Sequence, residues 1–238
     1  MSNKSFKFKQ FEVCQNLAAM KVGTDGVLLG AWAPVIDGGY CLDIGAGTGL
    51  LSLMLAQRTE SAKIIAIDID EGAFKQSSIN FINSKWSDRL QCYHTSLNEF
   101  VEFTEHKFDT IVCNPPFFQN GNVAPDKQRA IARHSYSLPF AELIDAVTRL
   151  LSTHGLFSLI LPKDGYEMFC EIAKLNGLYE QKRIEIRPNF AKVVHRVISC
   201  WALCSNQTEV EELIIEVDGR HNYSQKYKKL TKEFYLKF

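Results

Sequence analysis

Three short groups of residues in this sequence have the types and spacing to bind a charged ligand and to act on an amine. The first is the run DIGAGTG at residues 43–49. The second is a single acid, Asp68, which closes the apolar run KIIAI. The third is an Asn-Pro-Pro-Phe tetrad at residues 114–117, which follows the run DTIVC. At ordinary residue frequencies, a specified tetrad of this kind occurs at roughly one position in 10⁵.

The glycine-rich group predicts a nucleotide-like ligand. Gly45, Gly47 and Gly49 let the backbone turn sharply and approach a ligand closely, and the helix that follows offers free N–H groups to an anion. The dinucleotide fingerprint GxGxxG requires glycine where this chain has Leu50, and the GK[ST] of a P-loop is absent. Asp43 suits an ammonium group and would repel a pyrophosphate. S-adenosylmethionine, which carries an ammonium and a carboxylate, fits better, and a tight turn without a ligand is the alternative.

Asp68 is placed to bind the adenosine part of such a cofactor. An acid at the end of the second strand of this type of sheet accepts hydrogen bonds from both ribose hydroxyls. We expect the next two acids, Asp70 and Glu71, to lie at a helix N-terminus, where they complement the helix dipole. Ser96, after the third strand, either borders the adenine or caps the following helix.

The tetrad predicts the reaction. Its two prolines fix the backbone and remove two N–H donors, which leaves the Asn114 side-chain oxygen and the Pro115 carbonyl as acceptors beside an aromatic ring. An adenine amino group is planar and a poor nucleophile. Two acceptors that bind both of its N–H groups favour a pyramidal nitrogen, and the ring stacks on the extruded base. We expect Asn114, Pro115, Pro116 and Phe117 to form the catalytic site. A rigid loop without catalytic function is the alternative.

Apolar runs of strand length alternate with helical patterns after residue 35. The predicted strands are Tyr40–Ile44, Lys63–Ile67, Leu90–His94, Phe108–Cys113, Leu156–Leu161, Leu178–Ile186, Val193–Leu203 and Glu211–Val217. The predicted helices are Leu50–Gln57, Glu71–Asn83, Leu97–Phe103, Pro139–Leu151 and Asp164–Asn176. This order predicts an α/β fold with a mostly parallel sheet, helices on both faces and ligands at the carboxyl ends of the strands. The last strands lack a full helix between the final pair, which predicts an antiparallel edge. Before residue 35 we expect a short strand at Phe8–Val13 and a helix at Thr24–Trp32.

Charge is unevenly distributed along a chain that has 27 basic and 27 acidic residues. The absence of a net charge argues against a polycation that coats nucleic acid. Two segments are nevertheless basic, namely residues 181–196 and residues 220–238, and the second interleaves its bases with aromatic side chains. They predict a nucleic-acid surface, with a solvated surface and a tail anchored by its aromatics as the alternative. The candidate RNA contacts are Lys192, Arg196, Lys228 and Lys229.

A long segment, residues 118–138, follows the tetrad and contains two further candidates for phosphate contact. These are Arg129 and Arg133, although Arg133 is almost as well suited to an internal salt bridge. No apolar run is long enough for a membrane span, the N-terminus lacks the apolar core of a signal peptide, and no CxxC or histidine spacing predicts a metal site. We expect a cytoplasmic, monomeric protein with reduced thiols and no bound metal.

Taken together, the DIGAGTG run, Asp68 and NPPF resemble the class I S-adenosylmethionine-dependent methyltransferases that act on amino nitrogens. Two further stretches, MKVGTDGVLLGAWA at residues 20–33 and ARH at residues 132–134, resemble more closely the bacterial tRNA (adenine-N6)-methyltransferases that modify the purine 3′ to the anticodon of a valine tRNA. The resemblance extends over essentially the whole chain. Related enzymes often end the tetrad in tyrosine, so Phe117 keeps the stacking surface and lacks a hydroxyl.

The resemblance implies a seven-stranded, Rossmann-like sheet and S-adenosylmethionine as the methyl donor. Residues 1–35 would form a cap on the cofactor site, and residues 36–238 would form the methyltransferase domain with its basic tail. By the same resemblance, the methionine end of the cofactor would be bordered by Lys21, Gly23, Thr24 and Asp25. Gly23 and Gly26 would otherwise only shape the entrance of a helix.

Three alternatives to a tRNA substrate remain open from the residues alone. A glutamine amide also presents a planar NH₂ to an Asn-Pro-Pro-aromatic motif, although enzymes of that kind usually carry a helical recognition domain and only about 35 residues precede the sheet here. Methylation of DNA adenine usually needs a separate target-recognition region. A catalytically silent RNA-binding module would not need an intact glycine loop, Asp68 and tetrad.

Overall fold

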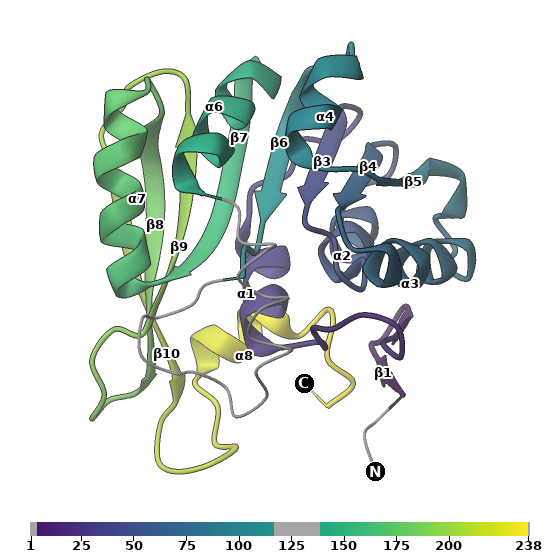
Figure 1. Ribbon diagram of the computed structural model, residues 1–238. Coiled ribbons are helices and arrows are strands. Elements are labelled where there is room, and N and C mark those ends of the chain that lie inside the picture. Colours follow the sequence, from purple (N-terminus) through teal and green to yellow (C-terminus); the bar gives the residue numbers. More distant parts are fainter. Residues whose placement is uncertain (1–3, 117–138, 238) are drawn as a thin grey trace, which may run out of the picture.

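One large sheet organises the part of the chain that the computed structural model describes, residues 4–116 and 139–237. Within those residues, the sheet has eight strands in the order β10-β8-β9-β7-β6-β3-β4-β5 (Figure 1). These strands are β3 (Tyr40–Ile44), β4 (Lys63–Asp68), β5 (Leu90–His94), β6 (Phe108–Cys113), β7 (Leu151–Pro162), β8 (Tyr179–Asn189), β9 (Arg196–Ala202) and β10 (Glu209–Glu216). The expected α/β fold is confirmed.

The pairing is mostly parallel, and it becomes antiparallel towards the C-terminal edge. From β5 to β7 all neighbours are parallel, whereas β9 is antiparallel to both β7 and β8. The structure differs from the expectation in two details. The antiparallel strand, β9, lies two places in from the edge of the sheet, because the short connection 190–195 reverses the chain into the space between β7 and β8. In addition, β10 pairs in parallel with β8, so the sheet has the eight strands of the sequence pattern, one more than the resemblance implies.

Helices cover both faces of the sheet. They are α1 (Thr24–Trp32), α2 (Leu50–Arg58), α3 (Glu71–Ile82), α4 (Leu97–Phe103), α6 (Phe140–Leu150), α7 (Lys163–Leu175) and α8 (Gln225–Thr231). Successive strand residues alternate between two apolar clusters. Cys41 and Val112 pack with α1, α2 and α3, while Leu42 and Ile111 pack with α4, α6 and α7. Because both faces of each central strand are buried, those strands are continuous apolar runs in the sequence.

The N-terminal segment differs from the single strand predicted at Phe8–Val13. It forms a two-stranded antiparallel sheet of β1 (Ser5–Lys7) and β2 (Glu12–Cys14). Phe8 donates its backbone N–H to the carbonyl of Phe11 at 2.8 Å, and the two rings stack with centroids 4.6 Å apart. The chain therefore reverses direction in the middle of this apolar run. The reversal lets Phe8 and Phe11 stack on each other and be buried together.

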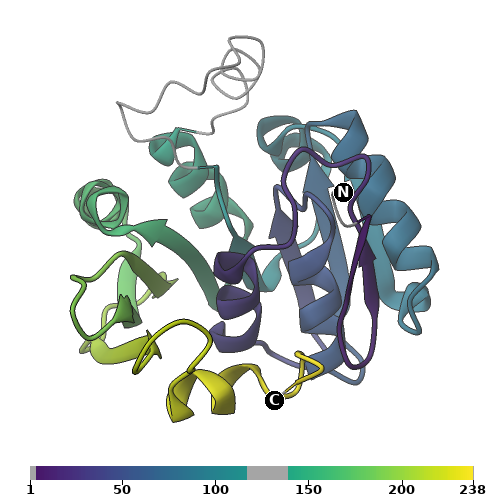
Figure 2. The same ribbon diagram turned by 90° about the horizontal axis from the view of Figure 1, so that it is seen from below.

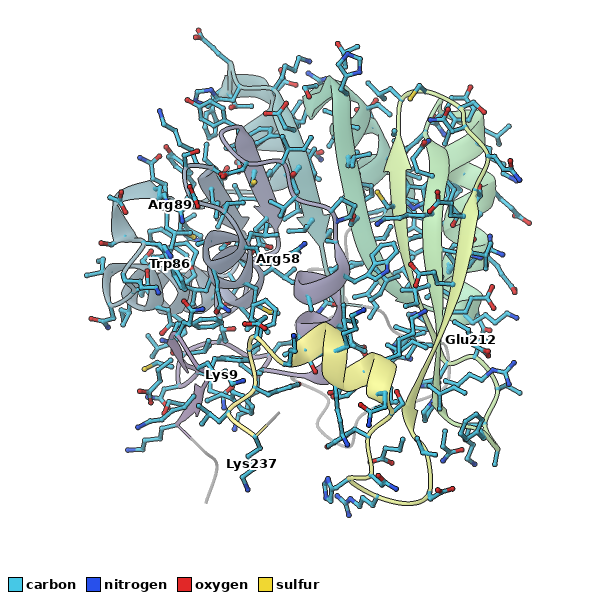
Figure 3. The ribbon with its side chains drawn as sticks, turned by 180° about the vertical axis from the view of Figure 1, so that it is seen from behind. Lys9, Arg58, Trp86, Arg89, Glu212 and Lys237 are labelled. Carbon is cyan, nitrogen blue, oxygen red and sulfur yellow. The ribbon has the colours of Figure 1, made fainter. Side chains whose placement is uncertain are left out.

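The basic tail contains a helix that sequence periodicity did not predict. α8 begins after Ser224, whose side chain accepts a hydrogen bond from the Tyr227 N–H. The helix packs against α1 and β10 (Figure 2), and both Tyr227 and Phe234 are buried. The two ends of the described chain also meet, because Lys9 donates its backbone N–H to the carbonyl of Phe234 at 2.8 Å and its ammonium group to that of Lys232 at 2.6 Å (Figure 3).

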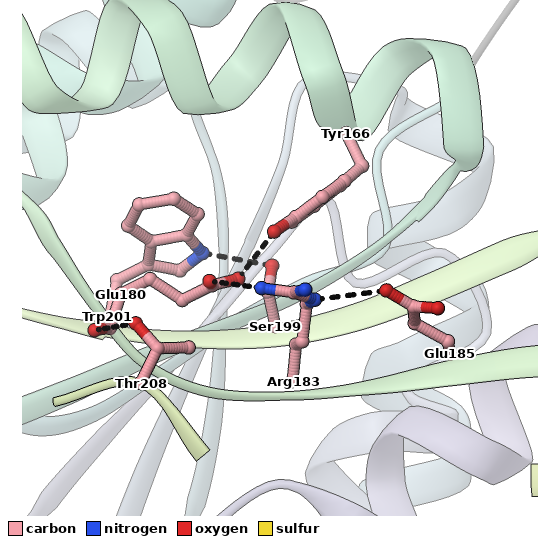
Figure 4. Close-up of polar contacts among 7 residues, drawn as sticks. All are labelled: Tyr166, Glu180, Arg183, Glu185, Ser199, Trp201 and Thr208. Atoms are coloured by element: carbon pink, nitrogen blue, oxygen red, sulfur yellow. Dashed lines mark hydrogen bonds and ion pairs between the residues drawn. The ribbon is translucent and has the colours of Figure 1, made fainter. Parts of the chain in front are cut away.

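A polar network fixes α7 to the C-terminal half of the sheet (Figure 4). The Tyr166 hydroxyl of α7 donates to the Glu180 carboxylate of β8 at 2.8 Å. The Arg183 guanidinium bridges that carboxylate and Glu185, at 3.0 and 3.1 Å. The Thr208 hydroxyl, just before β10, donates to the Glu180 carbonyl at 3.1 Å. These contacts connect α7, β8 and the start of β10 to one another beside the central strands.

Candidate functional site

The three groups of residues singled out in the sequence lie at one edge of the sheet. The glycine loop follows β3, Asp68 ends β4 and Asn114 follows β6. In the strand registers, Ile44 pairs with Ile67 on one side and with Cys113 on the other. The ends of three neighbouring parallel strands therefore bring these groups together, as the βαβ order requires.

The three glycines of the loop have two different structural functions. Gly45, Gly47 and Gly49 all have left-handed backbones, with φ of 72°, 57° and 77°, a region that L-residues with a side chain rarely adopt. A Cβ atom on Gly45 or Gly47 would meet no atom of the described chain within 4 Å, whereas a Cβ on Gly49 would lie 2.5 Å from a ring carbon of Phe81. The first two glycines border open space, and the third allows α2 to pack against α3.

Asp68 holds this loop in shape. One carboxylate oxygen accepts the Gly47 N–H at 2.8 Å, and the other accepts the Asp70 N–H at 2.9 Å. Burial raises the pKa of Asp68, and these two hydrogen bonds oppose that rise. Each carboxylate oxygen keeps acceptor capacity after its backbone bond, because a carboxylate has about four lone-pair sites. Asp70 is the N-cap of α3 and accepts the Ala73 N–H at 2.7 Å, as expected for a helix-terminal acid.

Asp43 is fully buried at the end of β3. Its Oδ2 accepts hydrogen bonds from the Ser52 N–H at 3.1 Å and the Ser52 hydroxyl at 2.7 Å, which anchors the first turn of α2. Its Oδ1 has no hydrogen-bond partner among the described residues. Desolvation raises the pKa of Asp43 to about 6. An unpartnered buried carboxylate oxygen is costly, and a cationic ligand beside it would relieve that cost.

Helix α1 passes close to the tetrad. A Cβ atom on Gly26 would lie 3.8 Å from Nδ2 of Asn114 and 3.0 Å from a methyl carbon of Leu50, so the small residue allows α1, α2 and the tetrad to converge. Asn114 is half-buried, as is Pro116, and Pro115 is buried. Phe117, the fourth residue of the tetrad, lies outside the described residues, as do Arg129 and Arg133.

The residues predicted from MKVGTDGVLLGAWA lie where α1 begins. Gly23 is the N-cap, with an extended backbone (φ −130°), and Lys21 and Thr24 are exposed. Asp25 forms an ion pair with Arg196 at 2.8 Å. The sequence predicts that Arg196 contacts RNA and that Asp25 borders the cofactor. In the structure the two side chains bind each other instead, and their ion pair connects the first turn of α1 to the start of β9.

The other predicted residues have the following surroundings. Ser96 is the N-cap of α4 in a capping box with Glu99, since its hydroxyl donates to the Glu99 carboxylate at 2.8 Å and accepts the Glu99 N–H at 3.2 Å. Lys192 is exposed in the connection between β8 and β9. On α8, Lys229 is exposed and Lys228 is half-buried.

Sequence reasoning missed two buried amides on α3. The Asn80 amide nitrogen donates to the carbonyls of Cys14 and Thr48, both at 2.8 Å, and its oxygen accepts the Cys14 N–H at 2.9 Å. One turn earlier, the Gln76 oxygen accepts the N–H groups of Asn16 and Leu17 at 2.8 and 3.0 Å. The available signal was a pair of amides four residues apart on the inward face of a helix, where polar side chains need partners.

Neither a metal site nor a membrane span is seen within residues 4–116 and 139–237. No group of three or more acidic, histidine or cysteine side chains in those ranges has the arrangement to hold a metal ion. None of the helices described there is long and apolar enough to cross a membrane.

Comparison with known proteins agrees with this geometry. A model of the family "Methyltransferase small domain" matches residues 22–138. A tRNA1(Val) (adenine(37)-N6)-methyltransferase of Flavobacterium psychrophilum is 48% identical over 98% of this chain and 99% of its own length. The protein of the same name from Vibrio campbellii is 39% identical over 100% and 98%. The chain belongs to the tRNA1(Val) (adenine(37)-N6)-methyltransferase family.

Solved structures place this methyltransferase among proteins of the same fold. An O-methyltransferase predicted in Agrobacterium tumefaciens has a TM-score of 0.68 at 16% identity, with 88% of this chain and 96% of that one covered. A ribosomal protein L11 methylase of Lactobacillus delbrueckii has a TM-score of 0.57 at 14% identity, with 80% and 83% covered. The family establishes S-adenosylmethionine as the cofactor of this methyltransferase. The open space at Gly45 and Gly47 and the unpartnered Asp43 oxygen fit this cationic ligand.

Proposed function

We propose that this methyltransferase transfers a methyl group from S-adenosylmethionine to N6 of adenine 37 in a valine tRNA. The relatives that carry this name match the chain over nearly its full length, which supports the choice of substrate. The position of Asn114 supports the proposed reaction. Asn114 lies beside the glycine loop at the carboxyl edge of the sheet, and Gly26 of α1 approaches it closely.

The glycine loop, the two strand-end acids and the start of α1 would hold the cofactor. Asp68 would accept hydrogen bonds from the ribose with the lone pairs that its backbone contacts leave over. Gly45 and Gly47 would let the loop backbone lie against the ligand, and the buried Asp43 oxygen would face its cationic end. When bound, S-adenosylmethionine supplies an electrophilic methyl group on a sulfonium. Lys21, Gly23, Thr24 and Asp25 would border the methionine end, with Asp25 also holding Arg196. Ser96 would border the adenine through atoms that its capping contacts do not use.

Asn114 and its prolines would prepare the target amine. The Asn114 side-chain oxygen and the Pro115 carbonyl would accept both N–H groups of the adenine amine, and this contact strengthens as the nitrogen becomes pyramidal. Such a contact stabilises the transition state more than the ground state, so no strong base is needed. Pro116 would keep the loop rigid, and Phe117, outside the described residues, would stack on the base.

A basic surface would bind the rest of the tRNA. Lys192, Lys228 and Lys229 would contact phosphates, as would Arg129 and Arg133 in the segment outside the described residues. Arg196 would contact RNA while its guanidinium also binds Asp25. Residues 1–35 would act as a cap on the cofactor site and residues 36–238 as the methyltransferase domain. A tRNA substrate implies a cytoplasmic location, and a monomer suffices because one chain supplies every residue proposed for the site.

Methylation of a defined transcript tests this function. The purified protein with S-adenosylmethionine should convert adenine 37 of an unmodified valine tRNA transcript to N6-methyladenosine, detected by nucleoside mass spectrometry. A transcript with guanine at that position should gain no methyl group. Asn114→Ala should lower kcat by about 100-fold or more and leave the Kd of the cofactor within about threefold. Methylation of a glutamine amide or of DNA instead, or an Asn114→Ala enzyme with normal kcat, would overturn the proposal.

A further inference from the structure

The connection between β8 and β9, residues 190–195, projects from the same edge of the sheet as the glycine loop and Asn114. β8 is parallel to β7, so its last residue, Asn189, lies at the carboxyl edge. The turn is well defined by hydrogen bonds. Lys192 donates its N–H to the Asn189 carbonyl at 3.2 Å, and His195 donates its N–H to the Ile186 carbonyl at 2.8 Å. The loop is therefore a fixed projection from the edge of the sheet that carries the candidate active site (Figure 1).

This loop exposes an unusual pair of apolar side chains. Phe190 is 62% exposed and Val193 is 82% exposed, and no aromatic ring in the described parts of the chain packs on Phe190. A phenylalanine so open to water is costly where it has no partner, and exposed apolar groups beside a functional site mark interaction surfaces.

The charged residues of the loop and of its two ends are all basic. No acid occurs between Ile186 and Arg196. Two of the bases there are neutralised by ion pairs, Arg187 with Glu212 at 2.7 Å and Arg196 with Asp25 at 2.8 Å. Lys192 pairs with no carboxylate of the described residues and is exposed. The loop thus presents an aromatic ring two residues from an unneutralised ammonium group.

A short path of contacts connects this loop to the tetrad. Arg196, the residue after the loop, binds Asp25 in the first turn of α1. The next residue, Gly26, is the point where α1 approaches Asn114. A substrate that extends from Asn114 along this edge of the sheet would therefore approach the β8–β9 loop.

We propose that the β8–β9 loop binds an unpaired nucleotide next to the target adenine. Phe190 stacks on its base, and Lys192 contacts its phosphate. Every nucleobase has a face on which an aromatic ring can stack, whereas paired bases are covered by their neighbours. An aromatic side chain beside a free cation matches the two parts of a single-stranded nucleotide. This inference rests on the proposed function, since it requires an RNA substrate.

The test compares variants of exposed residues in the full-length protein. Phe190→Ala should raise the KM for the valine tRNA transcript about fivefold or more, which is the lower end of what a lost stacking contact causes. The Kd of the cofactor and the Tm should change little, because the ring is 62% exposed and stacks on no aromatic ring of the described chain. Phe190→Trp should restore the KM. Leu175→Ala is the matched control, since Leu175 is 87% exposed at the far end of α7 and its loss should leave the KM unchanged.

Fluorescence separates stacking from a purely structural effect. The three native tryptophans are buried, so the added emission of Phe190→Trp reports on the loop. A stem-loop RNA with an unpaired anticodon loop should quench that emission, and a fully paired duplex should not. If the wild type methylates the transcript but Phe190→Ala keeps a normal KM, or if duplex and stem-loop quench equally, the loop proposal fails and the proposed function stands. If the wild type does not methylate the transcript, both fail.

Discussion

The amide nitrogen of Asn80 donates a 2.8 Å hydrogen bond to the carbonyl oxygen of Thr48, in the middle of the glycine loop. The same nitrogen also donates to Cys14. One buried side chain on α3 thereby joins the N-terminal segment to the loop that is proposed to hold the cofactor.

Asn80→Ala should loosen the glycine loop. We expect a loss of about 1–3 kcal/mol in stability, because buried backbone groups lose their partners, and a Kd for S-adenosylmethionine raised several-fold. Calorimetry well below the Tm, together with thermal unfolding, measures the two effects separately. Asn83→Ala, at the exposed residue that follows the same helix, is the control. A lower Tm with an unchanged Kd would show that Asn80 supports only the fold.

Gly45→Ala and Gly49→Ala should differ sharply. Both positions have positive φ, so each alanine is strained by about 1 kcal/mol. At Gly45 the added methyl group meets only open space, and we expect a folded protein with weakened cofactor binding. At Gly49 the methyl group would lie 2.5 Å from the Phe81 ring, which adds an overpacking cost of about 1–3 kcal/mol. Unfolding without cofactor should rank Gly49→Ala as clearly less stable. Equal Tm values would contradict the division of functions between these glycines.

Asp43→Asn should raise the stability of the cofactor-free protein at alkaline pH and weaken cofactor binding. The pKa of Asp43 is raised to about 6, so the folded state binds the proton more tightly than the unfolded state does. Proton binding by Asp43 therefore stabilises the folded state, and this stabilisation is complete below about pH 4. It is lost as the pH rises through about 6, and the free energy of unfolding falls by up to about 3 kcal/mol. Without cofactor, the variant should therefore be more stable than the wild type at pH 8 and gain nothing at pH 4. Its Kd for S-adenosylmethionine should rise. Thermal unfolding at both pH values, with calorimetry at pH 8, measures this, and a variant less stable at pH 8 would contradict it.

Reversing the charges of Lys228 and Lys229 should weaken tRNA binding and flatten its salt dependence, because phosphate contacts release counterions. The Tm and the identity of the methylated nucleotide should stay the same. Binding isotherms at several salt concentrations provide the slope, with Lys174→Glu, at an exposed lysine on α7, as the control. Truncation at Arg220 should by contrast lower the Tm, because it removes the buried Tyr227 and Phe234. A wild-type salt slope in the double variant would leave the tail with a structural function alone.

Strand and helix positions near the site were predictable because each lies in an apolar run with a clear period. The strand Phe108–Cys113 and the helices Thr24–Trp32 and Leu97–Phe103 begin and end where expected. α8 was missed because it is short and lysine-rich, and it is stabilised by packing against α1 rather than by its own pattern. The pair of Asp25 and Arg196 joins residues 171 positions apart, and no local pattern in one sequence encodes such a partner. Asn80 looks like any helical amide until the groups it binds are known.

The hydrogen bond between Lys9 and Phe234 has a consequence for biosynthesis. A ribosome adds about 5–20 residues per second, so β1 and β2 leave it on the order of ten seconds or more before the residues that will cover them. During that interval the sheet can assemble from β3 onward, while the outer side of α1 and the rings of Phe6 and Phe8 await Tyr235. The contacts between the two ends of the described chain therefore form only after the residues around Phe234 and Tyr235 have left the ribosome.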